Sequence, residues 1–199
     1  MVERGPHFLW IFATGNYQDF EKTFGKQESQ IIPCVLAVRD PRDALVSQYY
    51  SWKFTHKNNS PRILAAREEL LKLDERSGLK FLIEEKFFSF GNNISKWKDS
   101  LGELQKIHIL RYEEVLDDFS KSVGGALTHL GIDYTDELLI RVEQATSFKA
   151  KTSRKPGEED QTSHYRKGVA GDHLRLFDDE ITSLFNREYG SSLTALGYE

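Results

Sequence analysis

The sequence predicts an α/β fold in which a parallel sheet is flanked by helices. Two short apolar segments, residues 31–38 and 106–112, have the composition of strands, and most of the remaining chain spaces its apolar residues as helices do. Strands that alternate with helices along a chain are typical of this class. A length of 199 residues fits one domain, so we expect a single domain over residues 1–199, with an irregular lead-in over residues 1–30.

The first strand is predicted from the continuous apolar run Ile31–Val38 (IIPCVLAV). Its length and β-branched content suit a strand that is buried on both faces, as in a parallel sheet. A helix should begin directly after it, because Asp40 can act as the N-cap, Pro41 suits the first helical position and Asp43 favours the positive end of the helix dipole. A short helix over residues 17–24 is expected before the strand.

Later elements follow from the same spacing rules. The expected helices cover residues 61–88, 93–105, 113–130, 134–146 and 173–188. Glycines mark the weak points, at Gly78 in the first of these helices and at Gly124–Gly125 in the third, and Thr135 is the candidate cap of the fourth. The second strand, residues 106–112 (KIHILRY), alternates polar and apolar side chains. The last helix should bury Leu174, Phe177, Ile181, Leu184 and Phe185.

Composition excludes several classes of protein. A single cysteine, Cys34, leaves no internal disulfide and no zinc motif built on cysteine pairs, and none of the six histidines has ligand spacing, so we expect no metal. A net charge of -4 and a pI of about 5.9 argue against nucleic acid as a partner. The apolar runs fall far short of the roughly 20 residues of a membrane span. With no apolar leader of the secretory type, a cytoplasmic protein is expected.

The turn after the first strand is the first candidate binding site. Ligands of parallel sheets bind at the carboxyl ends of the strands, and the N-terminus of the following helix favours an anion such as phosphate or sulfate. Arg39 offers a fork of donors at this turn, and the Ser47 hydroxyl in the second turn of the helix can add a hydrogen bond. A surface ion pair with Asp40 or Asp43 explains Arg39 equally well.

The long segment between residues 149 and 172 is the second candidate. It shows no apolar period, and an irregular stretch of that length in a compact domain is typically a functional lid or disordered. From Ser147 to Arg175 there are seven Lys or Arg against four Asp or Glu, in an acidic protein. The side chains of Arg166 and Lys167 and the flexible backbone at Gly168 can together surround one phosphate. A solvated face is the usual meaning of a run of charge, but the length of the segment and the adjacent Arg-Lys-Gly favour a binding site.

Three further side chains are candidates for stacking on or bonding to a base. Phe148, which follows Thr146 at a helix end, offers a ring that can stack on any base. A core phenylalanine at a helix terminus is the simpler explanation, and Tyr112 after the second strand is similarly ambiguous. The sequence contains neither a G-x-x-x-x-G-K-[ST] nor a G-x-G-x-x-G motif.

Taken together, these segments resemble the sulfotransferase family that uses 3′-phosphoadenosine 5′-phosphosulfate (PAPS). In that family an Arg and a Ser eight positions apart lie on the strand and helix that bind the 3′-phosphate, and Arg39 and Ser47 keep this spacing. The other matches share the family's order along the chain: Leu110–Glu114 resembles its Tyr-Glu segment, Thr146–Phe148 its Thr-x-Phe segment, and Tyr165–Asp172 its Arg-Lys-Gly-x-x-Gly-Asp motif. The resemblance covers residues 31–199.

The resemblance implies a P-loop NTPase-like sulfotransferase fold and a nucleotide site. It assigns the 3′-phosphate to Arg39, Ser47, Arg166, Lys167 and Gly168, and the adenine to Tyr112, Thr146 and Phe148. It implies PAPS as co-substrate, adenosine 3′,5′-bisphosphate (PAP) as the bound product nucleotide, and transfer of the sulfuryl group to a hydroxyl or amine of a small acceptor.

The chain also departs from the family pattern. The Pro-x-Ser-Gly-Thr-type loop that wraps the 5′-phosphosulfate and supplies a catalytic Lys has no match, so we expect an N-terminally truncated fold. The catalytic base is unassigned, with His7 as a weak candidate, and His173 stands where the family often has Trp. We expect a sulfotransferase whose activity is reduced or depends on upstream sequence. The alternative is a non-catalytic nucleotide-binding module or a truncated remnant.

Two smaller expectations concern other activities and partners. A P-loop kinase-like enzyme is weakly supported, because the Walker lysine is missing. A missing first strand would leave an apolar sheet edge exposed. A second copy of the chain can cover this edge, so a homodimer is a possible state.

Overall fold

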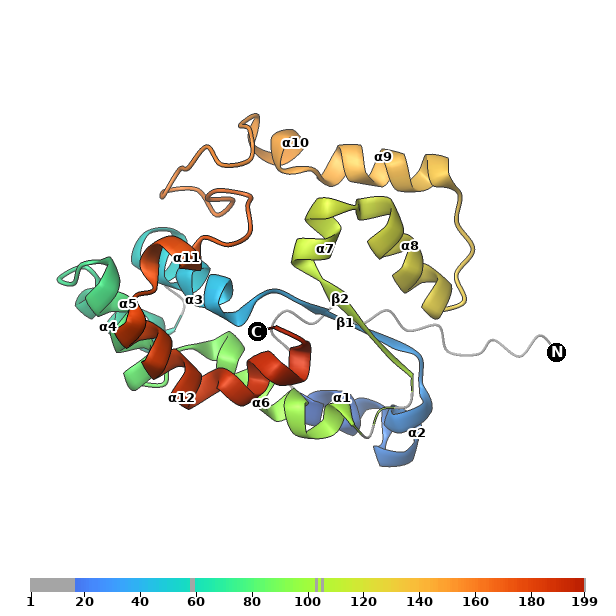
Figure 1. Cartoon of the computed structure of the whole chain (residues 1–199), viewed down its shortest axis with the longest axis horizontal. Coiled ribbons are helices and arrows are strands. Elements are labelled where there is room, and N and C mark those ends of the chain that lie inside the picture. The colour runs from blue at the N-terminus through green and yellow to red at the C-terminus, as the bar shows by residue number, and fades with distance from the viewer. Residues whose placement is uncertain (1–16, 58–59, 103, 105, 199) are drawn as a thin grey trace. The chain divides into compact units, whose positions relative to one another are not determined.

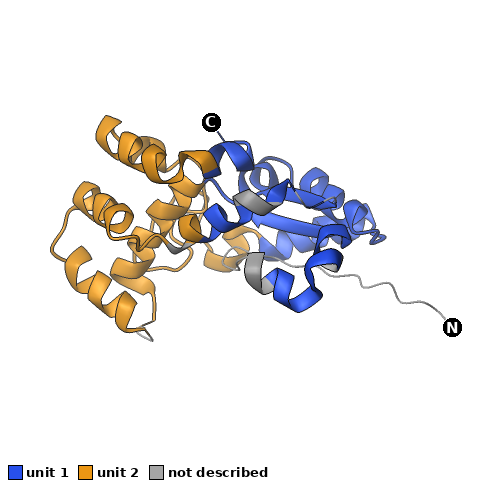
Figure 2. Cartoon of the chain, turned by 90° about the horizontal axis from the view of Figure 1, so that it is seen from below, with its two compact units in different colours: residues 1–40, 93–146, 192–199 blue, residues 41–92, 147–191 orange. Residues whose placement is uncertain are grey.

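The structure is a computed structural model, and it describes residues 17–57, 60–102, 104 and 106–198. The described chain divides into two compact units, which Figure 2 distinguishes by colour. Unit 1 holds the described parts of residues 1–40, 93–146 and 192–199, and unit 2 those of residues 41–92 and 147–191. The expectation of a single domain over residues 1–199 stays a prediction.

The sheet of unit 1 consists, among the described residues, of two parallel strands, β1 (Cys34–Val38) and β2 (Ile107–Arg111). Cys34 pairs with Ile107 and Val38 with Arg111, so both strands end at the same edge (Figure 1). Parallel pairing confirms the predicted class, which is here a helix-rich α/β fold. The first strand is shorter than expected, because residue 31 ends a helix and Pro33 has no N–H for a sheet ladder.

Unit 1 also contains helices, of which those over residues 112–117 and 119–129 contact β2. Its helices are α1 (Tyr17–Phe24), α2 (Lys26–Ile31), most of α6 (Ser89–Leu101), α7 (Tyr112–Asp117), α8 (Phe119–His129) and α9 (Asp136–Thr146). Val35 of β1 lies in one core cluster with Ala126 and Leu130, so α8 covers a face of the sheet. Thr135 caps α9 as predicted, since its Oγ1 accepts a hydrogen bond from the Leu138 amide at 3.2 Å.

Unit 2 is built from helices. They are α3 (Pro41–Tyr50), the π-helix η1 (Ser51–Thr55) that continues it, α4 (Pro61–Leu70), α5 (Glu75–Glu84), α10 (Phe148–Thr152), α11 (His173–Leu176) and most of α12 (Asp179–Leu196). Phe88, Phe185 and Tyr189 form a buried aromatic cluster, with ring centroids 5.2 to 6.0 Å apart. This cluster packs the middle of α12 against Phe88, which follows α5.

The predicted weak points at glycines were wrong. The helix expected over residues 61–88 breaks between Leu70 and Glu75, and Gly78 lies inside α5, where a Cβ would overlap the buried ring of Tyr49. Glycine is needed there for close packing and not for a bend. Asp74 caps α5 through a 2.8 Å hydrogen bond from the Ser77 amide.

The helix expected over residues 113–130 shows the same error. It breaks at Asp118, whose side chain caps α8 by accepting a 2.9 Å hydrogen bond from the Lys121 amide. Gly124 lies inside α8, where a Cβ would come within 2.7 Å of the Tyr134 hydroxyl. Packing against a neighbouring aromatic side chain again explains the glycine.

The last predicted helix divides into α11 and α12 at residues 177–178. Ile181, Leu184 and Phe185 are buried as predicted, but Leu174 is 77% exposed, so its inward placement was wrong. The short helix α11 turns at Phe177 before α12 begins, which breaks the helical spacing on which that prediction depended. Among the described helices, none has the length and apolar character that a membrane crossing requires.

Candidate functional site

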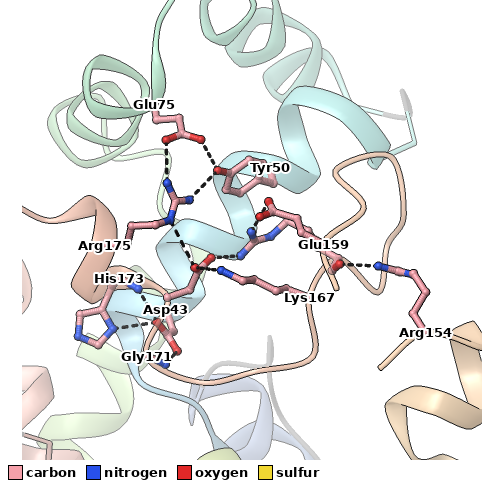
Figure 3. A network of polar contacts seen from close by, with 11 residues as sticks. Asp43, Tyr50, Glu75, Arg154, Glu159, Lys167, Gly171, His173 and Arg175 are labelled. Atoms are coloured by element: carbon pink, nitrogen blue, oxygen red, sulfur yellow. Dashed lines mark hydrogen bonds and ion pairs between the residues drawn. The ribbon is translucent and has the colours of Figure 1, made fainter. Parts of the chain in front are cut away.

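The irregular segment of unit 2 is fixed to the first turn of α3 by Asp43. This carboxylate is completely buried, and its Oδ2 accepts a hydrogen bond from the Gly171 amide at 2.7 Å. Its Oδ1 accepts from the His173 amide at 2.9 Å and lies 2.8 Å from the Nδ1 atom of the same residue (Figure 3). Asp43 therefore holds the end of the segment through two amides and a side chain, a role that its sequence position alone did not reveal.

Asp172 lies between these two anchored residues, and its carboxylate contacts two cations of the same segment. It is ion-paired with the Arg166 guanidinium, and its Oδ1 lies 2.6 Å from Lys167 Nζ. Burial raises the pKa of Asp172, but the hydrogen bonds from Lys167 and Arg166 outweigh that effect and hold its pKa below the ordinary value. Asp172 is thus a fixed anion that gathers both cations at one place.

Arg166 is enclosed on several sides. Its guanidinium lies 4.2 Å from the centroid of the Tyr50 ring, and its Nη1 is 2.7 Å from Glu159 Oε1. Burial lowers the pKa of Arg166, but hydrogen bonds to Asp172 and Glu159 more than compensate and raise it. The guanidinium is therefore permanently charged and already engaged with carboxylates, which share with phosphate the planar or paired oxygens that an arginine fork binds.

A second set of polar contacts surrounds the Tyr50 hydroxyl. Tyr50 donates to the Glu75 carboxylate, and Arg175 reaches both groups, at 3.3 Å from the tyrosine oxygen and 3.4 Å from the carboxylate (Figure 3). Burial and the hydrogen bond to Glu75 raise the pKa of Tyr50, so it keeps its proton. These contacts fix the ring on which Arg166 lies.

Gly168 and Phe148 are packed together beside the cations. Gly168 has φ of +66°, and a Cβ at this position would overlap the Phe148 ring. The Arg154 guanidinium lies 5.1 Å from the same ring and donates to the Arg166 carbonyl at 2.8 Å. Phe148 therefore packs against the irregular segment that carries the cations. Because Gly168 has no Cβ and a left-handed backbone, the Phe148 ring can approach it closely.

Ser47 shares a helix face with the residues that hold this segment. It lies four positions after Asp43 and three before Tyr50, and residues at these spacings project from one side of α3. Ser47, Phe148, Arg166, Lys167 and Gly168 all belong to unit 2. That they form one binding site for a nucleotide stays a prediction.

The other three predicted residues lie in unit 1. Arg39 follows β1, and its guanidinium lies 5.0 Å from the ring centroid of Tyr112, which begins α7 directly after β2. Parallel strands that end at the same edge account for this contact. Thr146 is the last residue of α9, where its hydroxyl donates to the Val142 carbonyl at 2.7 Å.

Glu113 joins the two turns at this edge of the sheet. Its Oε1 accepts a hydrogen bond from the Asp40 amide at 2.9 Å, and its Oε2 accepts one from the Tyr198 hydroxyl at 2.7 Å. Burial and this contact with Glu113 raise the pKa of Tyr198, which therefore stays protonated. The turn that carries Arg39 is in this way bonded to the turn that carries Tyr112.

Some of the predicted features could not be placed. His7 lies outside the described residues, and the catalytic base has no assigned position. Within the described ranges, no group of three or more His, Cys, Asp or Glu is arranged to hold a metal.

Sequence reasoning missed Glu159, Tyr50 and Arg154. For Tyr50 the signal was available, since it follows Asp43 by seven positions on the same helix face. No local pattern distinguishes Glu159 from its acidic neighbours, because its contact with Arg166 depends on the path of an irregular segment.

A sequence model of the Sulfotransferase domain matches residues 11–197 of this chain. The chain belongs to the sulfotransferase family. Among curated proteins, the sulfotransferase 2A6 of Mus musculus is 26% identical over 180 residues, and the 3-beta-hydroxysteroid sulfotransferase of Cavia porcellus is 27% identical over 187 residues. Each comparison covers 85% of this chain and 58% of the relative. The chain therefore spans little more than half the length of these sulfotransferases.

The fold of the family is also found among solved structures. The mouse sulfotransferase SULT7A1, solved in complex with PAP, superposes with a TM-score of 0.64 at 22% identity, over 90% of this chain and 64% of that one. This likeness shows the shared fold, so the expected sulfotransferase fold is confirmed for the part of the family's length that the chain spans.

Proposed function

We propose that this chain binds PAPS and transfers its sulfuryl group to a hydroxyl or amine of a small acceptor. The observation that carries the proposal is the Arg166-Lys167-Gly168 segment, which the family's motif assigns to the nucleotide's 3′-phosphate and which here gathers two cations around carboxylate oxygens. The family membership and the PAP named in the complex of the mouse relative support the same ligand.

The residues of unit 2 fit a phosphate on chemical grounds. An arginine fork and a lysine that already bind carboxylates can bind the oxygens of a phosphomonoester, and the Ser47 hydroxyl adds a neutral donor. Phe148 offers an aromatic face in the same neighbourhood. In unit 1, taken by itself, the Arg39 guanidinium lies on the Tyr112 ring, so a cation and an aromatic ring lie side by side there too.

PAPS supplies the sulfuryl group. Its bond from sulfur to the bridging oxygen of the 5′-phosphate breaks, and PAP leaves with that oxygen and the electron pair. A bond from sulfur to the acceptor oxygen or nitrogen forms as the acceptor loses a proton, so the products are PAP, the sulfated acceptor and one proton. The residues assigned above bind and orient the nucleotide and take no part in moving that proton. Because charge builds on the transferred and leaving oxygens, positioning and positive charge are the main requirements. The name of the guinea-pig relative, a 3-beta-hydroxysteroid sulfotransferase, supports a hydroxyl as the acceptor group.

Binding of PAP by alanine variants tests the nucleotide assignment. Arg166→Ala and Arg39→Ala should each weaken binding by about 1.5–3 kcal/mol, the usual loss for a charge-assisted contact, and Ser47→Ala should cost less. Arg141→Ala removes an exposed arginine from α9 and serves as the control. Wild-type affinity in both Arg39→Ala and Arg166→Ala would contradict the assignment.

Transfer itself needs a separate assay. Incubation with sulfur-35-labelled PAPS and a panel of small alcohols, phenols and amines should give labelled ester or sulfamate. PAP binding without any labelled product, for this chain and for a version extended to the length of its relatives, would favour the non-catalytic nucleotide-binding module instead.

A further inference from the structure

The Arg166 guanidinium is ion-paired with two carboxylates, Asp172 and Glu159, which differ in how firmly the structure holds them. Asp172 is nearly inaccessible, with 2% of its side chain exposed, and its neighbours on both sides are bonded to Asp43. Glu159 is 27% exposed and lies in the irregular segment seven positions before Arg166. Asp172 is thus part of the anchor, whereas Glu159 is the partner with room to move.

The backbone presents Glu159 to Arg166. The Asp160 amide donates to the Arg166 carbonyl at 3.0 Å, and the Gly157 amide donates to the Lys167 carbonyl at 2.8 Å. The segment that carries Glu159 therefore runs beside the two cations, and its 2.7 Å contact with Arg166 Nη1 follows from that path. The carboxylate is delivered at a high effective concentration, since the chain itself holds it in place.

We propose that Glu159 is an internal competitor of the nucleotide at this site: its carboxylate occupies the Arg166 edge that the ligand's phosphate takes, and it must leave when the phosphate binds. The inference rests on the proposed function. Only 10% of the Arg166 side chain is exposed. One edge of its guanidinium is bonded to Asp172, and one face lies on the Tyr50 ring. The remaining edge is covered by Glu159, the more exposed of the two carboxylate partners.

The proposal makes a prediction opposite in sign to that of a structural ion pair. If Glu159 only stabilised the segment, its removal would loosen Arg166 and weaken nucleotide binding. A competitor has the reverse effect on affinity, because the phosphate no longer has to displace an anion. In either role, removal of Glu159 lowers the stability of the ligand-free protein. Affinity and stability must therefore be measured together.

The test compares Glu159→Gln with the matched control Glu158→Gln in the full chain. Glu158 carries the same charge one position earlier, and its Oε2 accepts from the Lys155 amide at 2.9 Å. Calorimetric titration with PAP should show binding about threefold to tenfold tighter for Glu159→Gln than for wild type, the size expected for an ion pair of limited burial. Glu158→Gln should match wild type, and thermal unfolding without ligand should be lowered by Glu159→Gln.

Three results would overturn the proposal. Equal or weaker PAP binding by Glu159→Gln, while Arg166→Ala loses affinity, removes the competitor role and leaves the proposed function standing. An equal gain in Glu158→Gln shows a general effect of charge and no competition at Arg166. Absence of PAP binding by wild type and Glu159→Gln alike overturns the proposed function and this inference with it.

Discussion

Replacing Asp43 by asparagine removes the charge that holds the cationic segment and keeps the shape of the side chain. The donors around Asp43 include the Gly171 amide on one oxygen and two nitrogens of His173 on the other. An asparagine has one carbonyl oxygen, so its NH₂ group must face at least one of these donors. With the oxygen toward His173, the NH₂ group opposes the Gly171 amide.

The magnitude follows from these contacts. Two charge-assisted hydrogen bonds become neutral, which costs roughly 1 kcal/mol each, and one buried N–H is left without an acceptor, at about 1–3 kcal/mol. We therefore expect Asp43→Asn to lower the free energy of unfolding by about 3–5 kcal/mol. Asp179, which is exposed, also lies in the first turn of its helix, α12, and Asp179→Asn should cost only about 0.3–1 kcal/mol.

Urea unfolding at pH 7, followed by far-ultraviolet circular dichroism, measures both variants against wild type. The midpoint of Asp43→Asn should fall well below that of Asp179→Asn, with the slope unchanged. A loss for Asp43→Asn no larger than that of the control would refute the reasoning, because it would mean that the buried contacts contribute nothing beyond the helix dipole.

Three further predictions concern other parts of the chain. Gly78→Ala should destabilise the fold by about 1–3 kcal/mol, since overlap with a buried tyrosine ring outweighs a helix-propensity gain of about 1 kcal/mol; stabilisation in urea unfolding would contradict this. Burial raises the pKa of Cys34 to about 11, so a thiol reagent at pH 8 should label it only in urea, and rapid labelling of the folded chain would be the contrary result. Burial raises the pKa of Asp172, but Lys167 and Arg166 hold it below 3.8. Its stabilising contribution is therefore complete above the unfolded pKa and is lost as the pH falls through the folded value, so the stability difference between wild type and Asp172→Asn should shrink below pH 3.8; a constant difference would oppose it.

The strands and the turn that follows each of them were predictable from the sequence. The run that contains β1 is apolar throughout, the segment of β2 alternates, and Pro41 begins a helix where expected. These features depend on local composition and spacing. The contact between Arg39 and Tyr112 follows from the pairing of the strands, because parallel strands that end at one edge bring their following residues together, but the sequence pointed to the two residues only separately.

Helix breaks were predicted from the wrong residue type. Gly78 and Gly124 lie inside helices because an aromatic ring packs where a Cβ would be, which is a tertiary cause that no local pattern reveals. The actual breaks end at Asp74 and Asp118. Each of these aspartates caps the next helix by accepting a hydrogen bond from the amide of the residue three positions later. That aspartate signal was present in the sequence and is the better guide to where these helices begin.

The candidate site was only partly predictable. The basic residues of the irregular segment could be named from the sequence, but their contacts with Asp172 and Glu159 could not, because these contacts depend on the path of the segment. The hold of Asp43 on the end of the segment depends on the same path. A buried carboxylate at a helix start and an exposed one look alike in a sequence. The contacts that hold Arg166 therefore had to come from the structure.

Calorimetric titration of the wild-type chain with PAP, with adenosine 5′-monophosphate as the control ligand, tests the central claim most directly. Binding should require the 3′-phosphate, so PAP should bind and the monophosphate should bind far more weakly. Equal affinity for the two nucleotides, or no binding of either, would contradict the assignment of the Arg166-Lys167-Gly168 segment to a nucleotide 3′-phosphate.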